Sequence, residues 1–138
     1  MKGTLLERFS AKYEVDATTG CWKWVGSSNG RGYGEMRDKD GKRYAHRISY
    51  TLFKGDIPEG FVIDHLCRTP CCVNPAHLEA VSFRTNVIRG TGWAARHAAK
   101  THCPHGHEYS AENTHITSRG FRQCRACWKR KWHLYRQK

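Results

Sequence analysis

Residues 61–90 read FVIDHLCRTPCCVNPAHLEAVSFRTNVIRG and contain the clearest structural pattern of the chain. The apolar run at 61–66 predicts a strand, and residues 78–81 predict a second strand that returns beside it. Ser82 is a favourable N-cap for a helix over 83–89. The predicted order is strand, loop, strand, helix, and the loop between the strands is rich in Cys, Pro and Asn.

The residues before this pattern predict short helices and hairpins. Thr4 and Glu7 fit a capping box at the start of a helix over 4–13. Residues 21–45 alternate short apolar runs with polar, glycine-containing turns, which is typical of β-hairpins. Residues 46–54 predict another short helix. The sequence therefore predicts an α+β fold.

The composition indicates that a metal stabilises this fold. The chain has 138 residues, of which 38% are hydrophobic, so we expect a small core that needs a staple. The start is charged throughout, unlike a signal peptide, and no apolar run is long enough to cross a membrane. We therefore expect a cytoplasmic, intracellular protein. In such a reducing compartment the seven cysteines favour metal sites over disulfides.

The charge of the chain is strongly positive and uneven. Lys and Arg total 24 against 12 Asp and Glu, a formal net charge of +12. Residues 1–90 carry fourteen basic and ten acidic side chains, a net of +4, whereas residues 91–138 carry ten and two, a net of +8. Such a balance favours a polyanionic partner, and nucleic acid is the commonest one.

The loop after the first predicted strand has the spacing of a structural zinc site. Cys67, Cys72 and His77 follow one another at intervals of five residues, and a structural zinc ion takes four N or S ligands. Cys21, at the start of the predicted hairpins, is our choice for the fourth. Cys71 is the alternative for one position, although adjacent residues rarely bind the same ion. Zinc bound there would be structural and would fold the loop.

A second Cys/His group lies in the last third of the chain. Cys103 and His107 are followed by Cys124 and Cys127, an arrangement that supplies four ligands for a closed zinc site. His105 is the alternative to His107. Because so short a unit has almost no core of its own, we expect that it needs zinc to fold.

A basic segment follows this second group and predicts a helix over 125–136. Its role is either to grip DNA or only to pack on the preceding domain through Trp128 and Trp132. The cations around the second zinc site are candidates for contacts with DNA phosphates. They are Arg119, Arg122, Arg125, Lys129, Arg130 and Lys131.

The segment IDHLCRTPCCVNPAHLEAVSFRTN at 63–86 resembles the HNH endonuclease family, especially its small phage-borne and homing-type members. The spacing of its His and Cys residues is also similar to that of the His-Cys box homing endonucleases. The upstream run CWKWVG…GYG…AHR…GDIPEG is similar to what precedes the motif in phage HNH proteins. The resemblance covers residues 20–90, and the CPHGH…CRAC segment resembles the zinc-binding tail of some phage HNH proteins.

The resemblance implies a zinc-stapled ββα-metal nuclease core with β-hairpins, followed by a zinc-binding unit and a basic helix. We therefore expect four segments along the chain. They are an N-terminal helix or arm at 1–20, the HNH nuclease domain at 21–90, a linker at 91–102 and a basic zinc-binding unit at 103–138.

The resemblance also implies a catalytic pair. It makes His65 the general base, which phosphodiester hydrolysis needs to deprotonate water. It makes Asn86, on the predicted helix, a ligand of a catalytic metal. Because many family members have His at this last position, Asn there favours Mg²⁺ or a similar hard divalent ion. The expected cofactors are thus two structural Zn²⁺ and one catalytic Mg²⁺ or similar ion.

Asp64 is a second candidate ligand for the catalytic metal. Adjacent residues of a regular strand point to opposite faces, so Asp64 and His65 share one site only where the strand is distorted. The alternative is a supporting or surface carboxylate. Asn74, the middle Asn of the motif, lies in an Asn-Pro turn, and we expect it to hold the loop by hydrogen bonds.

Arg47 follows His46 in the AHR segment and has two possible roles. Its guanidinium could clamp the scissile phosphate, for which its planar fork is suited. It could equally form a salt bridge that anchors the predicted helix. The residues leave both roles open.

These features together predict a metal-dependent endonuclease that cuts or nicks double-stranded DNA. A single site per chain predicts nicking by a monomer or cutting of both strands by a homodimer. The alternative is a catalytically inactive DNA- or RNA-binding zinc protein.

Overall fold

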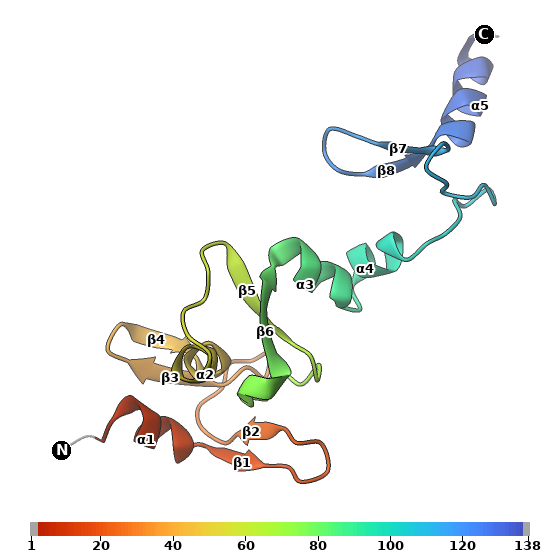
Figure 1. The fold of residues 1–138 in the computed structure, drawn as a ribbon. Coiled ribbons are helices and arrows are strands. Elements are labelled where there is room, and N and C mark those ends of the chain that lie inside the picture. The colour runs from red at the N-terminus through yellow and green to blue at the C-terminus, as the bar shows by residue number, and fades with distance from the viewer. Residues whose placement is uncertain (1–2, 137–138) are drawn as a thin grey trace. The chain divides into compact units, whose positions relative to one another are not determined.

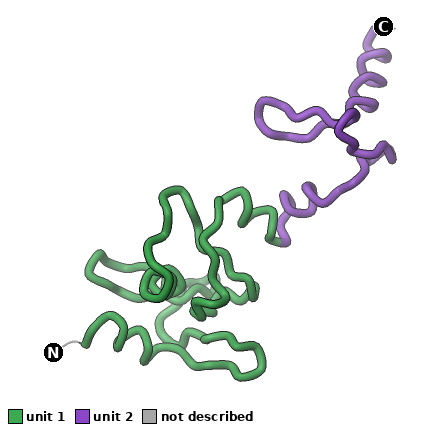
Figure 2. Tube along the Cα trace, viewed as in Figure 1, with its two compact units in different colours: residues 1–90 green, residues 91–138 purple. Residues whose placement is uncertain are grey.

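The computed structural model describes residues 3–136 (Figure 1). The chain divides into two compact units, residues 1–90 and residues 91–138 (Figure 2). Over the described residues, no helix has both the length and the apolar character that crossing a bilayer requires. The mixture of short helices and hairpins confirms the predicted α+β class.

The first unit begins with a capped helix and a hairpin. Helix α1 spans Leu5–Ser10, and Thr4 and Glu7 form the predicted capping box. The predicted helix extended to residue 13, but the observed helix ends at Ser10. Tyr13–Val15 is instead strand β1, which pairs antiparallel with β2 at Trp22–Trp24. The ring of Tyr13 is stacked on Trp22, so a cross-strand aromatic contact replaces the helical one.

A second hairpin leads directly into a helix. Strand β3 spans Glu35–Asp38 and pairs antiparallel with β4 at Gly41–Tyr44. Gly41 has a φ of 114°, which only glycine adopts easily, so the predicted polar turn closes at this residue. Helix α2 spans Ala45–Phe53 and starts without any break after β4.

The residues that follow form the predicted strand, loop, strand and helix. Strand β5 at Phe61–His65 pairs antiparallel with β6 at Leu78–Ser82. A short 3-10 helix, Pro75–His77, precedes β6, and helix α3 at Phe83–Arg89 follows it. In Figure 1, α3 continues directly from β6, at the end of the hairpin where β5 begins.

The core of this unit joins α1 and α2 to the hairpins. One side-chain contact fixes the loop against α2, because the Ser49 hydroxyl donates to the carbonyl of Val73 at 2.5 Å. Gly34 is required by packing, since a Cβ there would overlap the indole of Trp24. The buried residues of the core are Phe9, Trp24, Met36, Ala45, Ile48 and Val73.

The second unit is small and contains little buried apolar surface. Helix α4 spans Trp93–Ala98 and lies within the segment predicted as a linker. Strands β7 at Thr114–Ile116 and β8 at Arg122–Cys124 form an antiparallel hairpin. Helix α5 spans Arg125–Arg136, as the basic tail predicts, and has no buried residue.

Candidate active site and metal centres

The β5–β6 hairpin and α3 carry three of the predicted active-site residues. Asp64 and His65 end β5, which stays paired with β6 through both of them. Asn86 lies in α3, which is capped by the Ser82 side chain. The side chains of Asp64 and His65 are both buried.

The His65 imidazole is fixed in one tautomer. The ring is 8% exposed, and its Nε2 lies 3.1 Å from the carbonyl oxygen of Cys72. A carbonyl can only accept, so Nε2 carries the proton and Nδ1 keeps a free lone pair. Burial lowers the pKa of His65, although the Cys72 carbonyl and the Asp64 carboxylate act in the opposite direction. The ring is therefore a neutral base at pH 7.

Aromatic side chains surround His65. The rings of His46 and His65 meet edge to face, with centroids 4.8 Å apart. Tyr33 lies 5.6 Å from His46 and 5.9 Å from His65, centroid to centroid. Tyr44 is stacked on His46 at 5.5 Å. Aromatic rings, rather than water, therefore contact one side of the His65 imidazole.

His46 is one of the residues near the site to which the sequence analysis gave no role. Burial, followed by the nearby His65 and Arg47, lowers the pKa of His46 to about 3, so it is neutral at physiological pH. Its buried Nδ1 has no hydrogen-bond partner. The available signal was the AHR segment at the start of a predicted helix, but only the tertiary structure brings that helix against β5.

Asp64 is buried beside two arginines. Its side chain is 2% exposed, and Oδ1 accepts a hydrogen bond from Nη1 of Arg68 at 2.5 Å. Nη1 of Arg89 lies 3.6 Å from Oδ2, too far for a hydrogen bond, and Oδ2 has no hydrogen-bond partner. Arg89 also bonds to Glu79. The sequence analysis singled out neither arginine.

Asp64 and Asn86 fit a hard divalent ion better than they fit zinc. A buried carboxylate oxygen without a hydrogen bond is available as a ligand. Asn86 is half-buried on α3, and none of the hydrogen bonds among residues 3–136 involves its side-chain amide. Carboxylate and amide oxygens are the ligands that Mg²⁺ takes. The arginines beside Asp64 are 46% and 39% exposed, so both extend from the buried carboxylate to the surface.

The first predicted zinc site is assembled from two distant segments. Cys21, Cys67, Cys72 and His77 place one ligand atom each within 4.8 Å of one another. Nδ1 of His77 lies 3.6 Å from both Cys21 Sγ and Cys72 Sγ. Zinc–sulfur and zinc–nitrogen bonds of usual length give a tetrahedral edge of about 3.6 Å. The geometry is therefore compatible with zinc.

The loop around this site is buried and held by hydrogen bonds. Burial raises the pKa of the Cys72 thiol to about 12, so a zinc ion that binds there must displace the thiol proton. Asn74 holds the loop as expected, because its Nδ2 donates to the carbonyl of Gly20 at 2.6 Å. Cys71, the alternative ligand, lies outside the cluster.

The second predicted zinc site has equally short distances. Cys103 Sγ lies 3.6 Å from Cys127 Sγ and 3.4 Å from Nδ1 of His107. Cys124 completes the group, and all four ligand atoms lie within 4.8 Å of one another. A separation of 3.6 Å is too long for a disulfide and matches two ligands of one zinc ion. His105 lies outside the group, with its Nε2 3.4 Å from Nη2 of Arg130.

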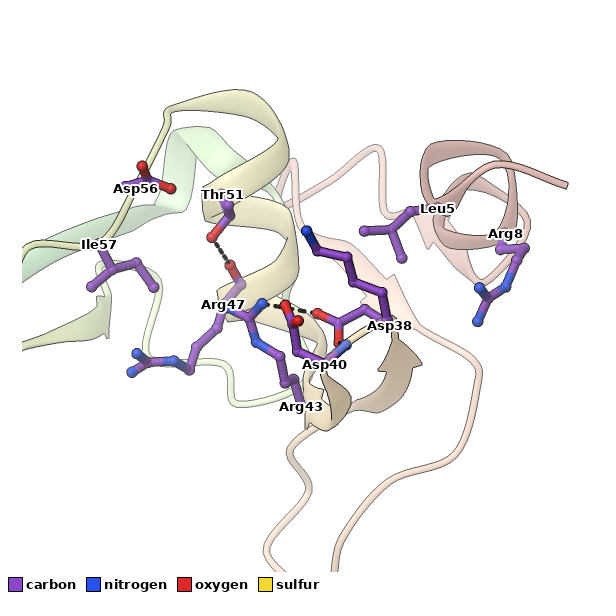
Figure 3. A pocket seen from close by; sticks show the side chains of 10 residues that line it. Leu5, Arg8, Asp38, Asp40, Arg43, Arg47, Thr51, Asp56 and Ile57 are labelled. Atoms are coloured by element: carbon purple, nitrogen blue, oxygen red, sulfur yellow. Dashed lines mark hydrogen bonds and ion pairs between the residues drawn. The ribbon is translucent and has the colours of Figure 1, made fainter.

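Arg47 lines a surface hollow of about 670 Å³ between α1, α2 and the β3–β4 turn (Figure 3). In Figure 3 its guanidinium points away from the ion pair between Asp38 and Arg43. None of the ion pairs among residues 3–136 involves Arg47. The structure thus gives no support to the anchoring salt bridge, and a phosphate contact by Arg47 stays a prediction.

The predicted DNA-binding cations differ in how free they are. Arg122 is engaged within its own unit, since it donates to the His97 carbonyl at 2.6 Å and lies 4.1 Å over the ring of Tyr109. Arg130 contacts His105 as described above. Arg119, Lys129 and Lys131 are exposed, and Arg125 is exposed while its Nε donates to the Thr114 carbonyl at 3.4 Å.

Comparison with known proteins agrees with the resemblance of the central segment to the HNH endonucleases. Residues 43–87 match the HNH endonuclease family. Protein 2.8 of Escherichia phage T7 is 34% identical over 84 residues, which are 59% of this chain and 56% of that protein. Protein 7.7 of the same phage is 36% identical over 58 residues, 42% of this chain and 45% of that protein.

A third relative is covered more completely. The uncharacterized gene 5.3 protein of Enterobacteria phage T3 is 35% identical over 78 residues, 51% of this chain and 77% of that protein. The chain spans only about half the length of the two T7 relatives. No solved structure matches the chain.

Proposed function

The chain belongs to the HNH endonuclease family, and from this we propose that it is a metal-dependent DNA endonuclease with His65 as its general base. One observation carries the proposal. The Cys72 carbonyl holds the proton of His65 on Nε2, so that Nδ1 is left as a free lone pair on a neutral ring. A fixed, neutral imidazole is suited to take a proton from water that attacks a phosphodiester.

The residues around His65 would keep it ready for this step. The rings of His46 and Tyr33 exclude water from the buried side, which favours the neutral form of His65. The Cys72 carbonyl would stabilise the positive charge that the ring gains with the proton. Such a base typically raises the rate by on the order of 100- to 10,000-fold.

Asp64 and Asn86 are the residues that would hold the catalytic divalent ion. The support is the buried Oδ2 of Asp64, which has no hydrogen bond, together with the free amide of Asn86. When bound, Mg²⁺ supplies the positive charge that stabilises the phosphate and its leaving oxygen. Arg68 and Arg89 would balance the Asp64 carboxylate before the ion arrives.

Zinc would have a structural role in both units. The first site joins Cys21, before β2, to the loop whose Cys72 carbonyl orients His65. Zinc binding energy there would act as folding energy for the catalytic loop. The second site would hold together a unit with little core, so that its exposed cations can contact DNA phosphates.

We propose double-stranded DNA as the substrate and nicking as the reaction of one chain. One active site per chain cuts one strand at a time, and cutting of both strands would need two copies. The phage origin of the relatives favours action on DNA inside a bacterial cell.

Cleavage of a supercoiled plasmid tests the proposal. The full chain, loaded with zinc, should convert the plasmid to the open-circular form when Mg²⁺ is added, and should leave it intact when Mg²⁺ is omitted. A labelled RNA duplex is compared with a labelled DNA duplex of equal length as a competing substrate. Intact plasmid with Mg²⁺ and with Mn²⁺ would overturn the endonuclease assignment, and preferential cutting of the RNA would overturn DNA as the substrate.

A further inference from the structure

Helix α5 presents an aromatic face that none of the residues 91–136 covers. Trp128, Trp132 and Tyr135 are spaced four and three residues apart, so they lie on one side of the helix. Their exposures are 59%, 51% and 73%. Three large rings left in water on twelve residues of helix are costly, and such a patch marks a binding surface.

The rings on this face are arranged as a platform. The indoles of Trp128 and Trp132 are nearly parallel, with an angle of 16° between their planes and centroids 5.9 Å apart. The guanidinium of Arg136 lies 5.6 Å from the centroid of the Trp132 ring. The face borders a surface hollow of about 590 Å³. It is lined by Gln123, Trp128, Lys131, Trp132, Tyr135 and Arg136.

The charge around the platform identifies the kind of partner. No Asp or Glu occurs between residues 113 and 136, and the whole unit has a net charge of +8. This charge favours an anionic partner over a second copy of so basic a unit. The partner must also present flat apolar surfaces to the two indoles. A nucleic acid has both features, but a duplex hides the faces of its bases in the stack, so only unpaired bases can reach the rings.

We propose that the Trp128–Trp132–Tyr135 face of α5 stacks on unpaired bases of a nucleic acid strand, while Lys131 and Arg136 contact its phosphates. The inference rests on the proposed function only in taking a nucleic acid as the partner. It adds a preference for DNA with an unpaired stretch. Lys131 is one of the cations already proposed to contact phosphate, whereas the aromatic face has no other role in the proposed function.

Two probes of equal charge separate stacking from electrostatics. The first is an oligothymidylate of about 12 nucleotides, which is within the usual site size for single strands. The second is an abasic deoxyribose-phosphate strand of the same length. Affinities of the zinc-loaded full chain are measured without Mg²⁺, so that a failure to cut DNA has no bearing on the result. We expect the oligothymidylate to bind about tenfold more tightly than the abasic strand.

Variants of α5 test whether the aromatic platform causes the preference for the oligothymidylate over the abasic strand. W128A/W132A should bind both strands with equal affinity, and Leu134→Ala, which removes an exposed apolar side chain away from the platform, should keep the tenfold difference. W128F/W132F should keep part of it, because a smaller ring still stacks. Zinc content confirms that each variant folds.

Two results would overturn the inference. One is equal affinity of the unmodified chain for the two strands, as expected if the aromatic face is instead covered by residues 1–90. The other is a base preference that W128A/W132A retains.

Discussion

His65 has a polar neighbour on one nitrogen and aromatic neighbours around its ring. The Cys72 carbonyl fixes its tautomer, and His46 and Tyr33 pack against it. These contacts distinguish His65 from the other eight histidines and support the role of general base that we propose for it. It also gives His46, which makes no hydrogen bond through Nδ1, a packing role in the same cluster.

Replacing His46 by Ala should destabilise the first unit. The side chain is 7% exposed and contacts three other rings, so its removal leaves a cavity that should lower the free energy of unfolding by about 2–4 kcal/mol. Urea unfolding of the zinc-loaded chain measures the change. His133→Ala, an exposed histidine on α5, is the control, and equal unfolding midpoints for the two variants would contradict the packing role.

Asp64→Asn should weaken the catalytic metal site without changing the zinc content. Loss of the carboxylate charge should raise the Mg²⁺ concentration for half-maximal nicking by about tenfold or more. Glu79→Gln is the matched control, because Glu79 also bonds to Arg89 but is exposed. Equal effects of the two substitutions would mean that Asp64 only forms ion pairs with the arginines and does not bind the metal.

The residues that the sequence identified are those with regular spacing. Cys67, Cys72 and His77 could be grouped by their intervals, and Asn74 by its turn chemistry. Arg68 could not be found in this way. Its backbone φ of 56° and its bond to Asp64 depend on how the loop leaves β5, which no local pattern encodes.

The loop between β5 and β6 is the element on which the geometry of the candidate site depends. Apart from the 3-10 helix at Pro75–His77 it has no regular structure, so its shape comes from Asn74, Ser49 and the Cys/His cluster. The loop supplies the carbonyl that orients His65. Zinc binding and nicking should therefore be lost together.

Adjacent cysteines provide a matched test of this loop. Cys72→Ser should lower the zinc content from two ions per chain to one and abolish nicking, because Cys72 belongs to the ligand cluster. Cys71→Ser should leave both unchanged, since Cys71 lies outside the cluster. Elemental analysis of the purified variants measures the zinc. A loss of zinc in Cys71→Ser alone would show that the ligand assignment is reversed.

Local patterns predicted most elements of the first unit and fewer of the second. The capping box at Thr4, the N-cap at Ser82 and the apolar runs of β5 and β6 are short-range signals. The β7–β8 hairpin and α4 have no comparable pattern. Asn113 helps to hold the hairpin, with Nδ2 donating to the Glu108 carbonyl at 2.6 Å, a contact that sequence periodicity does not reveal.

At the scale of the whole molecule, the charge is divided between the two units. Residues 1–90 contain the candidate catalytic site and have a net charge of +4, whereas residues 91–138 have a net charge of +8. The basic unit would thus supply most of the salt-dependent affinity for DNA. The sequence predicted this division of charge, but it did not reveal which cations are already engaged.

Salt dependence of duplex binding separates free cations from engaged ones. Lys129→Gln should reduce the slope of log affinity against log salt by about 0.9, because one phosphate contact is lost. Arg122→Gln should leave the slope nearly unchanged and instead destabilise the second unit, since Arg122 bonds to His97 and covers Tyr109. Fluorescence anisotropy over a salt series measures both slopes. Equal reductions would contradict the internal role of Arg122.

The rate of plasmid nicking by His65→Ala tests the central claim most directly. His115→Ala, an exposed histidine in the second unit, is the control for removing an imidazole. With both variants holding two zinc ions and supplied with Mg²⁺, the account predicts that His65→Ala nicks on the order of 100- to 10,000-fold more slowly than His115→Ala. Equal rates for the two folded, zinc-loaded variants would contradict the role of His65 as the general base.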